Sequence, residues 1–346
     1  MENTQRIGKG IPGKTMIKYK NNLINNIPML AAIMREQGRN RTFMAFFLIL
    51  FSFLSGYTNT SYPDTTENVL IINSDISIKN YSLAHTGFKS VIPHPKGEIN
   101  LGNKWKERSE TEKIIRESGP AIIYCIGIKA YLFAQEVTND ATVIFSSIIN
   151  WRRLTIKENT YGISSELLPS MQLTMYRYLF PKTNKIGVLY SKEYNEEWMQ
   201  QAREDAKDIG ICLVGISINK RTNITSALKK LLKNVDAIWL TSDPVVLSKT
   251  DAVSNIFQQC NAANIPVFTY SEAFIDAGAT LVISADIPTT GKQAARLTLD
   301  LLSRQEKIEK VNTPAGSHIS INLKKVAENK LILNADALDS VNQIIQ

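Results

Sequence analysis

One stretch near the start of the chain has the residue types and the spacing of a phosphate-binding loop. Residues 8–15 read GKGIPGKT, which matches the pattern G-x-x-x-x-G-K-[ST]. In a nucleotide-binding protein, the backbone amides of such a loop hold phosphates while Lys14 and Thr15 reach the phosphates and a magnesium ion. That chemistry needs a buried strand before the loop, yet only MENTQRI precedes Gly8. We therefore interpret the match as coincidental.

A second group of residues could bind a small polar molecule. Hydroxyl and acidic side chains stand where predicted strands end, which is where ligands bind in open parallel sheets. The acids could accept hydrogen bonds from an ammonium group, the serines could hold a carboxylate, and an aromatic ring could stack on an apolar part. The candidate ligand-binding residues are Ser146, Ser147, Ser164, Ser191, Tyr194, Asp243, Ser271, Glu272 and Asp286.

Each candidate also has an ordinary structural interpretation. The acids could be helix N-caps or hinge ion pairs, and Asp243 precedes Pro244 as caps often do. The serines could form turns, and Tyr194, like Trp151, could simply pack. Sequence alone leaves both interpretations open.

Residues for catalysis are not evident. The chain has no G-x-S-x-G elbow and no H-E-x-x-H helix, and His85, His94 and His318 are too scattered for a zinc site. We therefore expect no catalytic residue, no metal, no cofactor and no enzymatic activity.

An apolar run predicts export. Residues 43–54 read FMAFFLILFSFL, follow three arginines and are too short to span a bilayer comfortably. A buried core helix or an uncleaved anchor over residues 43–56 is the alternative. A signal peptide that starts at Met34 would have conventional length, and cleavage is expected near residues 56–60. Export to the periplasm excludes most enzymes that depend on cytosolic nucleotides.

The net charge of +8 carries no information about nucleic acid. Residues 1–56 hold eight Lys and Arg against Glu2 and Glu36, a net +6, which leaves +2 for the rest. The basic balance is therefore mainly a property of the leader, and we expect no nucleic-acid partner.

Regular alternation of strands and helices predicts the fold. Short apolar runs are typical of parallel strands covered on both faces, and stretches with helical spacing separate them. This order indicates α/β architecture with two doubly wound, Rossmann-like units. The predicted strands are 69–73, 121–126, 141–146, 185–191, 211–218, 236–242, 267–271 and 280–286. The predicted helices are 110–117, 167–179, 195–209, 222–232, 252–263 and 290–303.

The last two hundred residues or so resemble a known family, the ABC-transporter substrate-binding proteins of the tryptophan/tyrosine type. The matching pieces are CIGIKA (125–130), VIFSSI (143–148), YGIS (161–164), LFPKTNKIGVLYSKEYN (179–195), NVDAIWLTSDPVV (234–246) and NIPVFTYSEAFIDAGATLVISADIPTTGKQAA (264–295). A departure is Ile149-Asn150-Trp151-Arg152, where the family typically has an acidic residue and a proline.

The resemblance implies a type I periplasmic-binding fold. Its layout places a leader and signal or anchor at 1–60, lobe one at 66–163 plus 287–316, and lobe two at 165–285 plus 320–346. The chain would cross between lobes near 162–165, 286 and 315–321, and these crossings would form the hinge of a closing cleft.

The same resemblance implies a function. The protein would capture a small polar ligand, such as an amino acid or a derivative, and deliver it as a monomer to an ABC permease in the inner membrane. The alternative is a periplasmic sensor that signals to a membrane partner without transport.

Three cysteines are an odd number for an exported chain. Cys125 and Cys212 lie in apolar strands, where we expect buried free thiols, and Cys212 with Cys260 is the one plausible pair.

Overall fold

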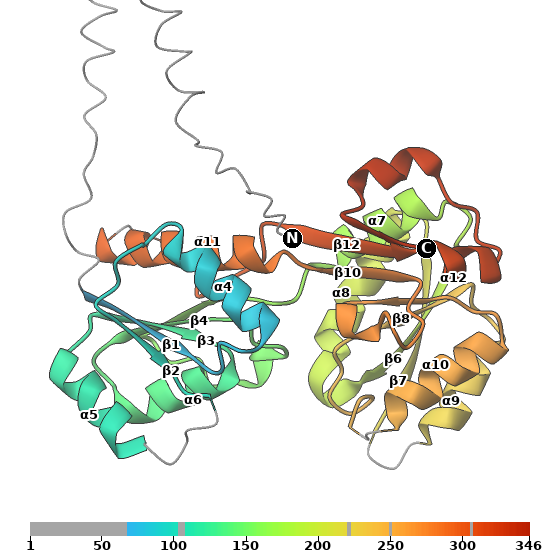
Figure 1. Cartoon of the computed structure of the whole chain (residues 1–346). Helices are drawn as coiled ribbons and strands as arrows, with labels where there is room; N and C mark the ends of the chain where they lie inside the picture. The colour runs from blue at the N-terminus through green and yellow to red at the C-terminus, as the bar shows by residue number, and fades with distance from the viewer. Residues whose placement is uncertain (1–67, 103–107, 220–222, 249–250, 305–306) are drawn as a thin grey trace, which may run out of the picture. The chain divides into compact units, whose positions relative to one another are not determined.

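The structure is a computed structural model that describes residues 68–102, 108–219, 223–248, 251–304 and 307–346. The apolar run at 43–54 and the phosphate-loop pattern at 8–15 lie outside the described residues. Within them, no helix combines the length and the hydropathy that crossing a membrane requires. The described chain forms two β-sheets, each covered by helices on both faces (Figure 1).

The first sheet has six strands in the order β11-β5-β4-β3-β1-β2, all parallel. The strands are β1 (Val69–Asn73), β2 (Gly97–Asn100), β3 (Ile122–Ile126), β4 (Thr142–Ser146), β5 (Thr160–Ile163) and β11 (Val311–Asn312). The helices are α4 (Lys79–Lys89), α5 (Arg108–Ser118), α6 (Ile128–Val137), the short η3 (Trp151–Arg153) and α11 (Ile287–Leu302).

Alternate residues of the first sheet's central strands face opposite helical layers. Leu70 and Ile72 pack in the cluster that includes α5 and α6 residues, whereas Val69 and Ile71 pack in the cluster that includes α4 and α11. All of β1 and β3 is therefore buried, which is why these strands read as continuous apolar runs.

Helices α4 and α11 approach each other through glycine. A Cβ built on Gly87 would lie 2.2 Å from the Pro288 carbonyl oxygen, and one built on Gly291 would lie 2.1 Å from the Ala84 carbonyl oxygen. Backbone atoms cannot swing aside as side chains do, so this crossing needs a residue without a side chain at both positions.

The second sheet has seven strands in the order β13-β12-β10-β9-β8-β6-β7. The β10–β12 pair is antiparallel and the other pairs are parallel. The strands are β6 (Lys185–Ser191), β7 (Cys212–Ile218), β8 (Ala237–Leu240), β9 (Val267–Thr269), β10 (Leu281–Ala285), β12 (Ser317–Asn322) and β13 (Gln343–Ile345). The helices are α7 (Pro169–Leu179), α8 (Lys192–Asp208), α9 (Ile224–Leu231), α10 (Ala252–Ala262), α12 (Leu323–Glu328) and the short η4 (Glu272–Phe274) and η5 (Ala335–Ser340).

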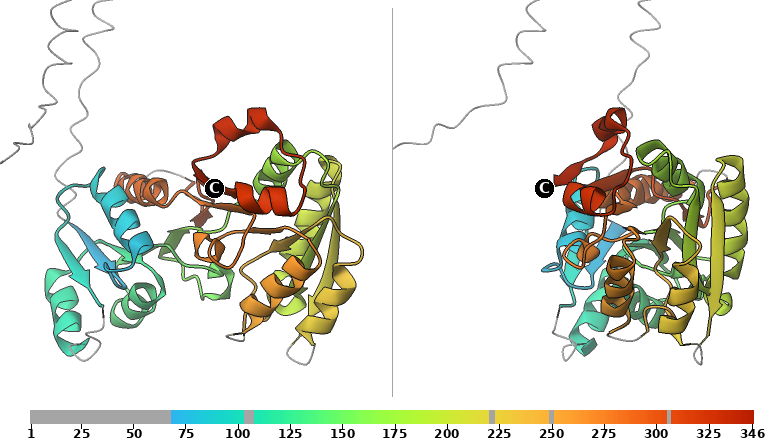
Figure 2. Two further views of the ribbon diagram at one scale, coloured as in Figure 1. Left: turned by 45° about the vertical axis from the view of Figure 1, so that its right-hand side comes forward. Right: turned by 90° about the vertical axis from the view of Figure 1, so that its right-hand side faces the viewer.

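One face of the second sheet is packed with aromatic rings, and the turned views in Figure 2 show helices on both sides of its strands. Trp239 is buried between Tyr176 of α7 and Trp198 of α8, with ring centroids 5.4 Å and 4.9 Å away. Phe268 stacks on Phe180 at 5.3 Å. Such pairs contribute beyond the apolar area that they bury.

The predicted α/β class is confirmed, and local sequence accounts for two helix ends. Asn223 caps α9 by accepting a hydrogen bond from the Ser226 amide, and Gly210 has a positive φ of 74° just after α8. The chain leaves the first sheet after β5 and again after β11, and returns to it after β10. The residue boundaries of the two lobes stay a prediction.

The cysteine predictions need one correction. All three cysteines are free thiols, so the Cys212–Cys260 pair is not formed. Cys125 is buried as expected, but Cys212 is exposed because it opens β7 at the edge of the second sheet. Burial raises the pKa of the Cys260 thiol to about 12.

Candidate ligand-binding site

A cavity lies at the carboxyl ends of β8, β9 and β10 in the second sheet. Thr241 and Ser242 follow β8, Tyr270 follows β9, and Ala285 ends β10. The segment 165–167 before α7 closes another side, and Ile149 from the loop after β4 also lines the space. The cavity is partly open, and its volume is about 40 Å³, enough for only a few water molecules. A larger ligand requires these walls to move apart.

Three aromatic side chains form part of the wall. Trp239, Trp198 and Tyr270 come from β8, α8 and the turn after β9. Trp239 is held edge-on between two other rings, so its position is set by the core. Burial and the nearby negative charge of Glu166 raise the pKa of Tyr270 to about 12, which keeps its hydroxyl neutral. The wall of the cavity is therefore partly aromatic.

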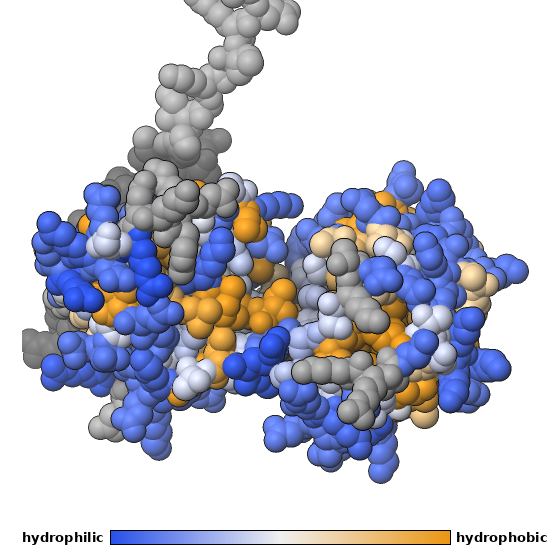
Figure 3. Space-filling view, turned by 90° about the horizontal axis from the view of Figure 1, so that it is seen from below, coloured by the Kyte–Doolittle hydropathy of each residue, from blue (hydrophilic) through white to orange (hydrophobic). Residues whose placement is uncertain are grey.

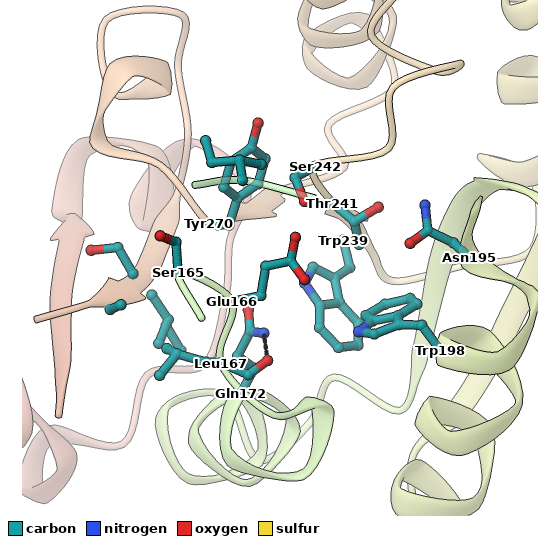
Figure 4. A pocket seen from close by; sticks show the side chains of 14 residues that line it. Ser165, Glu166, Leu167, Gln172, Asn195, Trp198, Trp239, Thr241, Ser242 and Tyr270 are labelled. Carbon is teal, nitrogen blue, oxygen red and sulfur yellow. Dashed lines mark hydrogen bonds between the residues drawn. The ribbon is translucent and has the colours of Figure 1, made fainter. Parts of the chain in front are cut away.

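Glu166 carries the negative charge of the cavity, and Figure 4 shows its side chain between Ser165 on one side and Trp239 on the other. Its backbone is fixed by a turn in which the Ser164 hydroxyl accepts from the Glu166 amide at 2.9 Å. Its Oε1 accepts from the Asn150 amide at 2.7 Å, and its Oε2 accepts from Arg152 Nη1 at 2.6 Å. The Arg152 guanidinium therefore balances the charge of this carboxylate.

Two hydroxyls of the cavity lack a partner. Ser165 Oγ and Thr241 Oγ1 are buried without a hydrogen bond to the described residues. Leaving buried polar groups unpaired costs free energy, of the order of 1–3 kcal/mol each. A ligand with polar atoms would satisfy them.

Asn195 presents an acceptor to the cavity. It sits at a break in α8, where its φ of −133° departs from helical geometry. Its Nδ2 donates to Asp243 Oδ2 at 2.6 Å, and since a carboxylate only accepts, this bond fixes the orientation of the amide. The Oδ1 atom is then the side of the amide that remains for a donor in the cavity (Figure 4).

A loop of the first sheet reaches the same region. Asn150 Nδ2 donates to the Ser242 carbonyl oxygen at 2.7 Å, and Arg153 stacks over the Tyr194 ring with 4.8 Å to the centroid. Asn150 adopts the left-handed region at φ 58°, as does Ser147, and Asn tolerates that region better than most residues do.

Comparisons with known proteins identify the family. A family model described as ABC transporter substrate binding protein matches residues 99–345. The chain belongs to this family. Its members bind ligands and act outside the cytoplasm.

This substrate-binding protein has similar proteins among characterised ones. A tyrosine-binding protein of Clostridioides difficile (strain R20291) is 23% identical over 231 residues, which cover 64% of this chain and 63% of the relative. The match thus spans less than two thirds of that relative's length.

Two solved structures share the fold. The L-Trp complex of an ABC domain from Streptococcus pneumonia has a TM-score of 0.55 at 17% identity and covers 80% of this chain and 99% of that one. The ligand-free, open structure of a substrate binding protein with adhesive properties from Clostridium difficile has a TM-score of 0.61 at 15% identity. The match covers 81% of this chain and 99% of that one. At these identities the likeness concerns the fold alone, and it agrees with the predicted type I periplasmic-binding architecture.

None of the nine residues predicted from sequence lines the cavity of this substrate-binding protein. Five are direct chain neighbours of lining residues. These five are Ser164, Tyr194, Asp243, Ser271 and Asp286. Along an extended backbone successive side chains point to opposite sides, so a shift of one residue separates a lining side chain from one that faces away. Their role as ligand contacts stays a prediction.

Several of the predicted residues hold the backbone in place. Asp243 is fully buried and accepts from the amide and the hydroxyl of Ser191. Asp286 caps α11 by accepting from the Thr289 amide at 2.8 Å. Ser271 caps η4 by accepting from the Ala273 amide at 3.3 Å.

Three further predicted residues are neither lining residues nor chain neighbours of them. Ser146 is buried and hydrogen-bonded to the Tyr124 hydroxyl at 2.6 Å. Ser147 has a buried hydroxyl without a partner among the described residues. Glu272 is 3.1 Å from His318 Nε2.

Sequence reasoning missed the residues that do line the cavity. Ser165, Glu166, Asn195, Trp239 and Thr241 were not proposed as ligand contacts. A usable signal existed for Thr241, because it directly follows the apolar run AIWL of β8. Glu166 offered none, because the strand before it, β5, was not predicted.

Proposed function

We propose that this protein captures an amino acid in the cavity at the ends of β8, β9 and β10, and delivers it to an ABC importer from outside the cytoplasm. The observation that carries the proposal is the composition of the cavity. It combines one carboxylate, two unpartnered buried hydroxyls and a wall of three aromatic rings. An aromatic amino acid has a group for each of them.

The groups can be matched one by one. The ligand ammonium would bind Glu166 and Asn195 Oδ1, both of which accept hydrogen bonds. The ligand carboxylate would receive hydrogen bonds from the Ser165 and Thr241 hydroxyls, and the ring would lie against Trp198 and Trp239. The printed names of the similar proteins, which include a tyrosine-binding protein and an L-Trp complex, support an aromatic amino acid as the ligand.

A closing motion is part of this proposal. The cavity is too small for an amino acid as it stands, and the loop after β4 spans from the first sheet to Ser242. We propose that the lobes at 66–163 plus 287–316 and at 165–285 plus 320–346 separate to admit the ligand and then close over it. Binding between two lobes of a monomer would give an ABC permease one closed surface to engage.

A thermal-shift screen of the twenty common L-amino acids tests the ligand class. L-tyrosine or L-tryptophan should raise the melting temperature of the purified full-length protein, because a ligand present at about 100 times its Kd adds about 2.7 kcal/mol of stability. Absence of a shift with every amino acid would contradict the proposal.

A pair of matched variants locates the site. Thr241→Val removes one unpartnered hydroxyl from the cavity, and Thr269→Val removes another buried, unpartnered hydroxyl from β9 outside it. Thr241→Val should weaken binding of the amino acid found in the screen by about 1–2 kcal/mol, measured by calorimetry, while Thr269→Val should leave the affinity unchanged. If Thr241→Val binds the amino acid as tightly as Thr269→Val does, the ligand binds outside this cavity.

Transport can be tested separately from binding. Uptake of the labelled amino acid should fall in cells that lack this protein. Unchanged uptake in cells whose protein binds the amino acid would instead favour the sensor that signals without transport.

A further inference from the structure

The acid of the cavity already has a basic partner. Arg152 Nη1 lies 2.6 Å from Glu166 Oε2, and the guanidinium is stacked over the Trp151 ring at 4.8 Å from its centroid. The Arg152 side chain is 51% exposed while that of Glu166 is 22% exposed. The indole thus supports a guanidinium that can contact both Glu166 and the solvent.

No other Lys or Arg among the described residues forms an ion pair with a side chain lining the cavity. Arg152 belongs to η3, in the stretch Asn150-Trp151-Arg152-Arg153 that follows β4. The Asn150 amide of the same stretch donates to the other oxygen of Glu166. One short loop therefore determines the electrostatic surroundings of this carboxylate.

We propose that Arg152 and Glu166 together bind the zwitterionic head of an α-amino acid, with the ammonium at Glu166 and the carboxylate shared between Arg152 and the Ser165 and Thr241 hydroxyls. This inference rests on the proposed function and adds a specificity-determining residue to the site. The ligand enters between the two charges and replaces their direct ion pair by two new ones. A guanidinium matches a carboxylate in geometry, since two of its N–H groups can donate in parallel.

The arrangement selects against molecules that carry only one of the two charges. An amine competes with Arg152 for Glu166 and leaves the guanidinium without its carboxylate. An acid without an ammonium brings a second negative charge close to Glu166. Both mismatches leave a charged group without an opposite charge in a partly desolvated place, which is costly.

The test compares three probes on the full-length protein by isothermal calorimetry. L-tyrosine carries both charges, tyramine lacks the carboxylate, and 3-(4-hydroxyphenyl)propionate lacks the ammonium. Wild-type protein should bind L-tyrosine most tightly. In Arg152→Gln the affinity for L-tyrosine should fall about 10- to 100-fold, while that for tyramine should stay the same or rise. The same series with L-tryptophan, tryptamine and 3-indolepropionate covers the case in which tryptophan binds.

Two further variants serve as controls. Arg152→Lys keeps the charge but not the paired donors, so it should recover only part of the lost affinity. Arg153→Gln removes the same charge one residue further along, where the guanidinium stacks on the Tyr194 ring. This variant should lower the affinities for L-tyrosine and tyramine only weakly and by the same factor. Melting temperatures without ligand show that each variant is folded.

The outcomes separate the two proposals. If Arg152→Gln changes the affinities for L-tyrosine and tyramine by the same factor, Arg152 acts only by neutralising Glu166, and the inference is overturned while the amino-acid site stands. If no amino acid binds the wild-type protein, the proposed function is overturned and the inference with it.

Discussion

The two sheets bury their faces by different means. In the first sheet, α4 and α11 meet backbone to backbone through Gly87 and Gly291. In the second, the face covered by α7 and α8 is filled by large rings centred on Trp239. The first arrangement depends on the absence of side chains, and the second on their presence. Both give buried parallel strands, so the fold alone does not dictate the packing.

The difference has a functional consequence. Trp239 and Trp198 belong both to the packed face and to the wall of the cavity, so we expect substitutions there to change both stability and ligand binding. The glycine crossing of the first sheet contributes no residue to the cavity. Substitutions there should change stability without changing affinity.

The first sheet also carries apolar side chains at its surface. Figure 3 shows apolar residues at the surface among hydrophilic ones. Several exposed apolar side chains follow the carboxyl ends of β1, β3 and β4, and one of them, Ile149, also lines the cavity. They are Ile76, Ile78, Ile128, Leu132 and Ile149.

The largest effect is expected for Trp239→Ala. Removal of a buried indole should lower the free energy of unfolding by about 3–5 kcal/mol and should also weaken amino-acid binding. Phe88→Ala is the matched variant in the first sheet, where Phe88 is fully buried and stacked on Tyr124 at 4.2 Å. Phe88→Ala should lower the free energy of unfolding, measured with urea, by a similar amount and should leave the affinity of the folded protein for the amino acid unchanged. Loss of affinity in both variants would remove the distinction between the sheets.

Gly291→Ala should have the next largest effect. The added methyl group meets the Ala84 carbonyl oxygen, and overpacking of this kind costs about 1–3 kcal/mol even though alanine favours helix by about 1 kcal/mol. Gly97→Ala is the control, because its Cβ would meet only the flexible end of Leu70 at 3.1 Å. Urea unfolding should show a clear loss for Gly291→Ala and little for Gly97→Ala. If Gly291→Ala is as stable as Gly97→Ala, helices α4 and α11 can move apart without a loss of stability.

The burial of each strand explains which strands the sequence could predict. Strands buried on both faces, such as those over 69–73 and 236–242, are visible because every residue is apolar. Strand β2 at the edge of the first sheet alternates between half-buried and exposed residues, and β12 reads SHISIN. Neither has the continuous apolar run on which the predictions relied. Helix α6 was missed because its apolar residues surround it rather than lie on one side.

Five of the nine residues predicted from sequence directly precede or follow a residue that lines the cavity, but none of the nine lines it. Strand ends can be located from apolar runs, yet which of two adjacent side chains faces the ligand depends on where the strand stops and how it twists. Ser242 lines the cavity whereas Asp243 turns inward to bind five donors. A single sequence does not contain that information.

Asp243→Asn should have an intermediate effect that again links stability to binding. The Asp243 Oδ2 atom accepts from Ser191 and Asn195, and an amide nitrogen in its place would face these donors, at a cost of about 1–3 kcal/mol. Asn195 would lose the bond that orients its amide, so the affinity for the amino acid should fall too. Asp236→Asn is the control, since Asp236 accepts from two exposed amides of the same sheet away from the cavity. A fall in stability without any fall in affinity would show that Asn195 does not touch the ligand.

The smallest effect is expected at Asp286, where the sequence prediction and the structure lead to different outcomes. As a ligand contact, Asp286 would bind an ammonium through its charge, so both Asp286→Asn and Asp286→Ala would weaken binding by about 1–3 kcal/mol. As the N-cap of α11 it needs only an oxygen that accepts from Thr289, and asparagine supplies one. Because Ala285 and not Asp286 lines the cavity, we expect Asp286→Asn to change neither stability nor affinity. Asp286→Ala should lower the free energy of unfolding by about 1 kcal/mol and leave the affinity unchanged. Calorimetry on the two variants decides the question, since loss of affinity in Asp286→Asn at an unaltered melting temperature would return this acid to the binding site.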